Sequence, residues 1–436
     1  MRSRVNLVVS VLMLLCFSCK KDNSQFSDLT NNVTTYSQSS GIESLTEKTY
    51  VSSTADLSAV KVTGGTLNLS GSTVSSSSNS SSTDNSTFYG LNAVILAYSA
   101  TGFAIINSSG NKVSSTGTGA NGIFAFGGAS ISSSGDKFTH TGSGGHAIMC
   151  SGGGIMTVKN DTAVTSGGSS SVIATDRGGG TISVTGGIYS SNGSNSAAIY
   201  STGNITCTNA TLASNGAEAL VTEGSNKIVL NNCTVKCTFN KWGSLLYQSM
   251  SGDASGVDGY LTMTGGSFTY TGKSGGLFYN TNSTAYITLK GVNISNSCDT
   301  LIRCIKGSWG GSSASSGGIT YFSTKQQTIS GIIHTDAYST MYIILEDYSS
   351  FTGAINKSNT AKAIGLTMDG NSTWTVTATS YINGTITCLG ISGTSVSNII
   401  GNGNNVYYTL STNSGLGGKT YTLVNGGYLL PAGPPQ

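Results

Sequence analysis

Charge, proline, histidine and tryptophan are all scarce in this chain of 436 residues. Asp, Glu, Lys and Arg together make up 9% of it, and there are only 3 prolines, 3 histidines and 3 tryptophans. So little charge leaves no basic surface of the kind that binds nucleic acid. Few prolines, with glycines that keep no three-residue register, exclude collagen. A helical protein of this size is excluded because it needs far more Ala, Leu, Glu and Lys.

Small and hydroxylated residues take the place of the missing types. The chain has 72 Ser, 56 Thr and 60 Gly, which together are 188 residues, about 43% of the sequence. A flexible Gly/Ser linker shares this bias but lacks apolar residues. Here 37% of the residues are hydrophobic, and they recur in short β-branched runs. The composition therefore predicts a long all-β chain with a substantial core.

The N-terminal residues have the features of an export signal. Arg2 and Arg4 precede an apolar stretch, 5–17, that is too short to span a bilayer permanently. Cys19 follows a small residue at the end of this stretch. The arrangement resembles the lipobox of bacterial lipoproteins, which implies cleavage before Cys19 and acylation of that cysteine. The alternative is a plain secretory signal, 1–18, with an incidental cysteine.

The residues after Cys19 indicate where such an anchor lies. In lipoproteins of this type, Asp directly after the acylated cysteine retains the protein at the inner membrane. Here that position is Lys20, and the run 20–22 resembles surface-export signals, so we expect an outer-membrane protein exposed on the cell surface. Without residues 1–18 the chain has 21 − 2 = 19 basic and 18 acidic residues, a net charge of +1. The polar residues 19–40 are predicted to be a flexible tether.

The body of the chain is a repeat. Six segments alternate apolar and polar residues and start 26, 23, 23, 33 and 26 residues apart, and Ile106 and Ile131 continue the series upstream at spacings of 25. A further residue, usually apolar, lies seven positions after each start, and another short apolar run lies between successive segments. Each period therefore holds about three short strands. The six segments are 156–160, 182–186, 205–209, 228–232, 261–265 and 287–291.

A period of this length with three strands is typical of one coil of a parallel β-helix. One coil cannot bury its own inward face, but coils stacked about 4.8 Å apart form a continuous core. The Asn or Gly that ends each segment fits a left-handed corner. We therefore predict a right-handed parallel β-helix of roughly 13 to 15 coils over residues 41–405. Residues 406–436 are predicted to be a cap and tail, with a hairpin of 406–410 and 421–424; a β-sandwich or propeller array is the alternative.

The stacked Ser-, Thr- and Gly-rich coils, such as 187–193, resemble the right-handed β-helix of bacterial adhesin-like and autotransporter passenger domains, the pertactin-like family. Residues 371–377, with Trp374, look like the tryptophan-containing coil near the end of many passengers. The resemblance covers most of the mature chain and implies a surface protein that works by contact. No membrane barrel follows Gln436, so we expect the lipid on Cys19, and not self-transport, to hold the protein.

Candidate catalytic groups are few. Polysaccharide lyases and pectin-type hydrolases share the β-helix fold, and their sites need paired carboxylates or a Ca²⁺ site with a basic residue. Here Asp253 and Asp258 share a loop without a basic neighbour, and His146 is predicted to be an ordinary turn residue. Asp136 and Asp161 occupy equivalent positions in consecutive coils, where they either stack around a cation or lie exposed in turns. We therefore predict no enzymatic activity, no catalytic residue, no metal and no cofactor.

The cysteines show no metal-binding or regular disulfide pattern. Seven of the 9 cysteines lie beyond Cys19, an odd number, so at least one thiol is unpaired in an exported protein. Cys207 lies at an inward ladder position and is predicted to be a small core residue. No spacing fits a zinc site. We expect most of these thiols to be buried and reduced, with Cys298 and Cys304 the pair worth testing for a disulfide. The seven are Cys150, Cys207, Cys233, Cys237, Cys298, Cys304 and Cys388.

Two tryptophans lie on the longest interruptions of the repeat, Trp242 within 238–259 and Trp309 within 306–311. Insertions in repeat folds emerge as surface loops, so these rings are candidates to stack on sugars; the alternative is that each packs against its own loop. Together these features predict an adhesin-like protein that binds host or bacterial glycans or surface proteins. A β-helix polysaccharide lyase or glycoside hydrolase, and a structural stalk without activity, are the alternatives.

Overall fold

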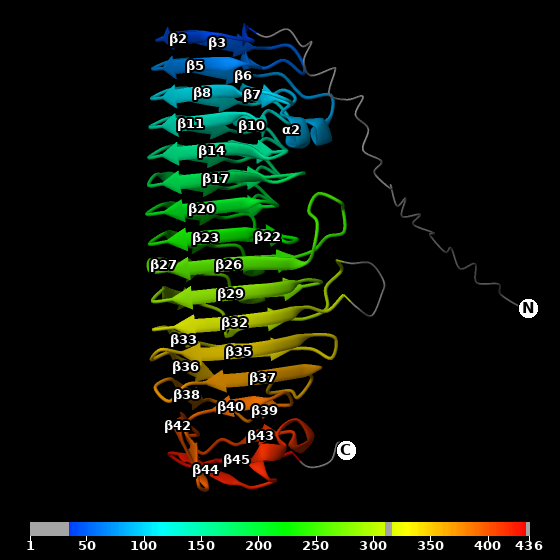
Figure 1. Ribbon diagram of the computed structural model, residues 1–436, viewed down its shortest axis with the longest axis vertical. Helices are drawn as coiled ribbons and strands as arrows, with labels where there is room; N and C mark the ends of the chain where they lie inside the picture. The colour runs from blue at the N-terminus through cyan, green and yellow to red at the C-terminus, as the bar shows by residue number, and fades with distance from the viewer. Residues whose placement is uncertain (1–34, 310–315, 433–436) are drawn as a thin grey trace, which may run out of the picture.

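The structure is a computed structural model that describes residues 35–309 and 316–432. The chain forms a rod of stacked coils, with the first coils at one end and the last at the other (Figure 1). It is a β-solenoid of about 16 turns, so the predicted parallel β-helix is confirmed. The predicted signal peptide, Cys19 and the tether as far as residue 34 lie outside the described residues.

Within the described residues, three long parallel sheets form the walls of the rod, and each coil from β1 to β30 contributes one strand to each wall; toward the C-terminus a 9-stranded sheet takes up further strands. The 12-stranded sheet contains, in spatial order, β1 (Tyr36–Gln38), β4 (Val60–Val62), β7 (Ile95–Ser99), β10 (Ile123–Gly127), β13 (Ile148–Ser151), β16 (Ile173–Thr175), β19 (Ile199–Ser201), β22 (Leu220–Glu223), β25 (Trp242–Tyr247), β28 (Gly276–Thr281), β31 (Thr300–Cys304) and β34 (Ile332–Thr335). Because β1 pairs in parallel with β4, the solenoid begins inside the segment predicted as tether.

In the second and third walls, as in the first, every third strand along the chain joins the same sheet over β1 to β30. The 14-stranded sheet contains β2 (Ile42–Thr46), β5 (Gly65–Ser70), β8 (Ala104–Ser109), β11 (Ser130–Ser134), β14 (Gly154–Lys159), β17 (Gly180–Thr185), β20 (Asn204–Thr208), β23 (Lys227–Asn231), β26 (Asp258–Thr264), β29 (Thr284–Lys290), β32 (Ile319–Lys325), β35 (Thr340–Glu346), β37 (Ala363–Met368) and β40 (Ile386–Cys388). The 10-stranded sheet contains β3 (Thr49–Ser52), β6 (Thr73–Ser76), β9 (Lys112–Ser115), β12 (Lys137–His140), β15 (Thr162–Thr165), β18 (Ile188–Ser191), β21 (Thr211–Ser214), β24 (Thr234–Cys237), β27 (Ser267–Tyr270) and β30 (Asn293–Asn296).

The register of the stacked coils is the one predicted by aligning the repeat segments of the chain with one another. The apolar starts of the aligned segments pair with one another from coil to coil along the 14-stranded sheet, and they are Ile106, Ile131, Met156, Ile182, Ile205, Ile228, Leu261 and Ile287. The corner residues after these segments have left-handed backbones, with φ between 51° and 67°; they are Asn160, Gly186, Asn209, Asn232, Gly265 and Gly291. Alternation along each strand therefore fixes which side chains enter the core.

The C-terminal end differs from the prediction in its pairing. The predicted hairpin of 406–410 with 421–424 is wrong. Instead β44 pairs antiparallel with β45, across a turn at 425–427 in which all three residues have positive φ. β43 pairs in parallel with β45. The strands here are β33 (Thr328–Ser330), β36 (Ser350–Gly353), β38 (Thr373–Val376), β39 (Ser380–Ile382), β41 (Ile391–Ser392), β42 (Ser395–Ile400), β43 (Val406–Tyr408), β44 (Tyr421–Val424) and β45 (Tyr428–Pro431), with short 3-10 helices η2 (Leu410–Thr412) and η3 (Ser414–Leu416).

The helix α2 (Thr83–Tyr89) packs beside the 12-stranded sheet, on the same side of the rod as the loop between β25 and β26 (Figure 1). The Ser82 side chain caps its first turn, and Gly90 ends it with φ of 77°. Phe124 and Met149, which point out of the solenoid, belong to a second apolar cluster beside this helix. The outer face of this sheet is therefore covered near the N-terminal coils.

Candidate functional site

A groove runs along the outer face of the 12-stranded sheet. It consists of two hollows of about 630 and 450 Å³ that share Ser171, Asn195, Tyr200 and Tyr247, so the two are continuous. The first hollow reaches residues of α2, and the second reaches Trp309. We call the whole depression the groove, and the part formed by the four shared residues its waist.

The strands below the groove carry apolar side chains on both faces. Ile199 of β19 lies in the main core, whereas its neighbour Tyr200 lies in a separate outer cluster. In β25, Leu246 lies in the core, and Leu245 and Tyr247 lie outside it. In the sequence these strands are therefore continuous apolar runs without apolar and polar alternation, which is typical of strands that are buried on both faces. The outward-facing side chains of these strands include aromatic rings, and these rings line the groove.

Both predicted tryptophans line this groove, and the structure brings them together. Trp242 stacks on Tyr279 of the next coil, with ring centroids 4.1 Å apart and an angle of 17° between the rings. Trp309 is 41% exposed, and its ring centroid lies 5.0 Å from that of Tyr247. The prediction that Trp242 lies on a loop is wrong. Trp242 is the first residue of β25, because it pairs with Gly276 of β28. Each tryptophan ring therefore packs against a tyrosine of the 12-stranded sheet.

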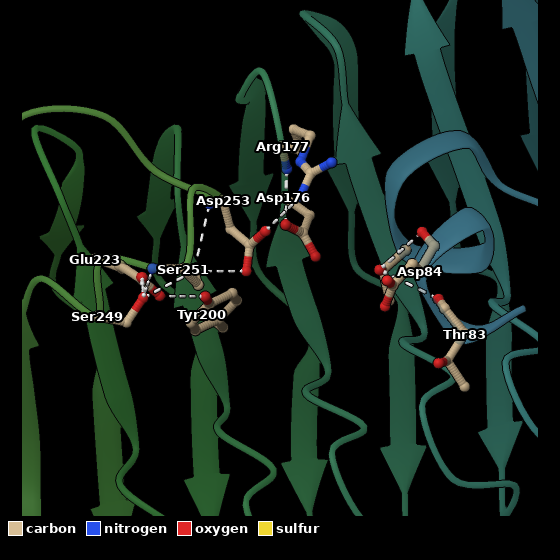
Figure 2. Close-up of polar contacts among 10 residues, drawn as sticks. Thr83, Asp84, Asp176, Arg177, Tyr200, Glu223, Ser249, Ser251 and Asp253 are labelled. Atoms are coloured by element: carbon tan, nitrogen blue, oxygen red, sulfur yellow. Dashed lines mark hydrogen bonds and ion pairs between the residues drawn. The ribbon is translucent and has the colours of Figure 1, made fainter. Parts of the chain in front are cut away.

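Glu223 lies behind the waist and is a residue of the groove that the sequence patterns above do not predict. It is only 1% exposed, at the end of β22. The hydroxyl of Tyr200 donates to its Oε2 atom at 2.5 Å, and Ser249 donates to Oε1 (Figure 2). The hydroxyl of Tyr247 also donates to Oε2, at 2.8 Å. The signal that was available is the sequence position itself, since Glu223 ends an apolar strand run in a chain with very few acids.

Arg177 connects three distant parts of the chain. Its guanidinium forms an ion pair with Asp253 at 3.1 Å (Figure 2), and it also lies over the ring of Phe88 in α2, 3.8 Å from the ring centroid. The expectation that Asp253 has no basic partner is therefore wrong. The partner is 76 residues away in the sequence, and only the stacking of coils brings the two together.

Asp176 lies beside this ion pair and is buried at the end of the strand β16. Its Oδ1 atom accepts a hydrogen bond from the backbone N–H of Arg177 at 2.7 Å. Burial raises the pKa of Asp176 to about 7, and the negative charge of Asp253 adds to the shift. This carboxyl group therefore changes its protonation state near neutral pH.

Asp136 and Asp161 stack as predicted, but they are buried and not exposed in turns. Both are fully buried, and each accepts a hydrogen bond from the backbone N–H of the residue one coil earlier: Asn111 donates to Asp136 at 2.6 Å, and Asp136 donates to Asp161 at 2.9 Å. The hydroxyl of Ser133 lies within hydrogen-bond distance of both carboxyl groups. Burial raises the pKa of Asp136, and it raises that of Asp161 to about 7. These groups belong to the core.

His146 is a turn residue, as predicted, but its ring also lines the groove. The ring is buried, and its Nδ1 atom lies 3.1 Å from the carbonyl oxygen of Ser171. Burial lowers the pKa of His146 to about 4, so the imidazole is neutral at pH 7. A neutral ring leaves the groove without a positive charge at this position.

All seven described cysteines are free thiols, and all except the half-buried Cys388 are buried. Cys207 lies in the main core, as predicted. Cys298 and Cys304 are likewise unpaired, so the structure contains no disulfide between them. Burial raises the pKa of Cys304 to about 12, which keeps the thiol protonated and unreactive.

Within residues 35–309 and 316–432, no group of three or more His, Cys, Asp and Glu side chains is placed to hold a metal ion. The same residues include no helix that is long and apolar enough to cross a membrane. Comparison of the chain with known protein families, with curated proteins and with solved structures finds no match.

Proposed function

We propose that this protein binds glycans in the groove and presents this site from the cell surface, as an adhesin-like protein. The observation that carries the proposal is the row of aromatic rings along the groove: Tyr200, Trp242, Tyr247, Tyr279 and Trp309. Aromatic rings with a polar edge bind the apolar faces of sugars while their hydroxyl and N–H groups form hydrogen bonds. The shape also fits, since an open groove accommodates a chain better than a compact ligand.

The length of the groove supports an extended ligand. It reaches from His146, just before β13, to Trp309, just after β31. These two strands are six coils apart in the 12-stranded sheet, and at about 4.8 Å per coil this distance is roughly 30 Å. Serine and asparagine side chains at the waist, Ser171 and Asn195, supply hydrogen-bonding groups between the rings. The groove therefore offers several sugar-sized sites in a row.

Substitution of a groove tryptophan tests this proposal. We expect Trp309→Ala, and separately Trp242→Ala, to raise the Kd for a bound oligosaccharide about tenfold, because each removes one aromatic stacking surface of the groove. Isothermal titration calorimetry against a panel of hexasaccharides measures the effect. Tyr348→Ala is the matched control, since Tyr348 is 70% exposed and does not line the groove. Equal Kd values for all variants, or no binding by the wild-type protein, contradict the proposal.

Attachment through a lipid on Cys19 is part of the same proposal, and the apolar stretch and small residue before this cysteine support it. We expect Cys19→Ala to release the protein from the membrane fraction, because the unmodified chain lacks the acyl groups that anchor it. Cell fractionation with immunoblotting measures the distribution. Cys388→Ala, which removes a half-buried thiol of the solenoid, is the control and should leave the protein with the membranes. A Cys19→Ala variant that still pellets with membranes argues against acylation there.

Hydrolysis of the bound glycan is the second candidate function, and Asp176 is the observation that favours it. With a pKa of about 7, Asp176 is in the range of a general acid at neutral pH, and it lies close to Asp253 and behind the groove. Incubation of the wild-type protein with each polysaccharide of the panel separates the two functions. New reducing ends indicate hydrolysis, unsaturated products indicate a lyase, and retention without cleavage supports binding alone.

A further inference from the structure

The two tyrosines of the waist have a defined hydrogen-bond direction. Tyr200 and Tyr247 both donate their single hydroxyl proton to Glu223, which lies behind them and is 1% exposed. A phenol has one O–H donor, so a tyrosine that donates to the carboxylate has only acceptor capacity left for a ligand. At the waist, these two oxygens therefore accept hydrogen bonds from a ligand and donate none.

This direction distinguishes between classes of glycan. A neutral sugar carries hydroxyl groups, which donate to the phenolic oxygens of Tyr200 and Tyr247. Carboxylate and sulfate groups only accept, so at these two positions an anionic sugar places an acceptor against an acceptor. A buried polar group without a partner lowers affinity, since it loses its hydrogen bonds to water and gains none.

The charges around the groove also disfavour the binding of anionic glycans. Two basic side chains are each compensated by an acidic partner: Lys241 interacts with Glu218, and Arg177 forms an ion pair with Asp253. Among the described residues, the other charged groups at or behind the waist are the carboxyls Asp84, Asp176 and Glu223, whereas Arg303, paired in register with Tyr279, is a single cation toward the far end of the groove. His146 adds no positive charge, because its lowered pKa keeps it neutral at pH 7. An anionic ligand therefore meets an excess of negative charge, which opposes its binding.

We propose that the groove selects neutral glycans and rejects uronate and sulfated ones, and that Glu223 sets this selectivity by holding Tyr200 and Tyr247 as acceptors. This inference rests on the proposed glycan-binding function and names the class of ligand. Glu223 acts through the two tyrosines, as a positioning residue, because its own carboxylate is buried behind them.

The test compares neutral and anionic ligands of equal length. Neutral gluco-, manno-, xylo- and N-acetylchito-hexasaccharides form one arm, and galacturonate, alginate and sulfated hexasaccharides form the other. For the wild-type protein we expect at least tenfold weaker binding in the anionic arm. For Glu223→Gln we expect the ratio between the arms to fall about tenfold, since an amide –NH₂ in place of Oε2 donates to the two phenols, whose protons then turn toward the ligand, and one negative charge is lost.

The control for the loss of charge is Glu346→Gln, which removes a carboxylate on the 14-stranded sheet that is paired with Lys325 at 3.5 Å. This variant should keep the wild-type ratio. A second measurement needs no variant: raising the salt concentration screens charge, so it should strengthen wild-type binding of the anionic arm and leave the neutral arm unchanged. This measurement stands even if Glu223→Gln does not fold.

Each result has a distinct meaning. Tighter binding of the anionic arm by the wild-type protein, or anionic binding that weakens with salt, overturns the selectivity while glycan binding stands. A ratio unchanged in a folded Glu223→Gln overturns the role of Glu223. If neither arm binds, the proposed function itself is wrong, and the selectivity falls with it.

Discussion

Substitution of Gly167 by Ala is expected to destabilise the solenoid by about 3 kcal/mol, because the added methyl group has no space. Glycines at one corner stack on one another through successive coils. A Cβ atom on Gly167 lies 2.0 Å from the carbonyl oxygen of Gly142, and one on Gly193 lies 1.8 Å from that of Gly167. The strands on both sides of the corner are paired in register with the neighbouring coils, so the backbone cannot move apart locally.

The measurement is the midpoint of guanidinium unfolding, followed by far-UV circular dichroism. Gly370→Ala is the matched control, because a Cβ atom there has no neighbour within 4 Å and the backbone does not have a positive φ. The control should be neutral or slightly stabilising, since Ala restricts the unfolded chain more than Gly does. Equal midpoints for the two variants show that the coils separate more easily than their pairing implies.

Asp161→Asn is expected to stabilise the protein at pH 8 by about 2 to 4 kcal/mol and to have little effect at pH 4. In the folded protein the pKa of Asp161 is raised from 3.8 to about 7 by burial, and the neighbouring charge of Asp136 contributes. Between these two pH values the folded state binds a proton that the unfolded state has released. The free energy of unfolding therefore falls as the pH rises from about 4 to 7, by at most about 4 kcal/mol for this group.

The hydrogen bonds show why an amide suits this position. Ser133 has one proton, which serves Asp136, so its contact with Asp161 is satisfied when Asp161 itself is protonated and donates. Two coils earlier, Asn111 occupies the equivalent corner position, and its Nδ2 atom donates to the hydroxyl of Ser108 in its own coil and to the carbonyl oxygen of Leu69, both at 2.9 Å. An amide at residue 161 can donate in the same way at every pH, without a buried charge.

Thermal unfolding between pH 4 and pH 8 measures this difference. Glu43→Gln is the control, since Glu43 is exposed on β2 and its removal should leave the pH profile unchanged. The raised pKa of Asp136 should leave some pH dependence in the Asp161→Asn variant. A variant that is less stable than the wild-type protein at pH 8 shows that Asp161 is ionised and well solvated in the folded state.

The coil repeat was predictable because it depends on local periodicity. Strand alternation predicts that Ile182, Ile205 and Ile228 point inward, and a stack of coils then pairs them directly, as the structure confirms. The corner positions were predictable for a similar reason, since Asn and Gly adopt a left-handed backbone with the least strain. Asn160 and Gly186 have φ of 54° and 67°.

The groove was predictable only in part. Trp242 and Trp309 were recognised as candidates because insertions in a repeat emerge at the surface. That the two rings line one groove depends on which wall of the solenoid each insertion faces, and neither local spacing nor composition contains this information. The environment of Asp136 and Asp161 was predicted incorrectly for the same reason: turn acids are usually exposed, but here the corner folds their side chains into the core.

The sequence by itself determined the all-β solenoid, its three-strand coil and its register, because each of these follows from a period of apolar residues that a single coil cannot bury alone. The tertiary structure decided the site. Glu223 with Tyr200 and Tyr247, and Arg177 with Asp253, come from different coils or from insertions, so their contacts exist only once the coils are stacked. The physical reason is that stacking joins residues one or more full periods apart, whereas the choice of side chain on the outer face is not constrained by the repeat.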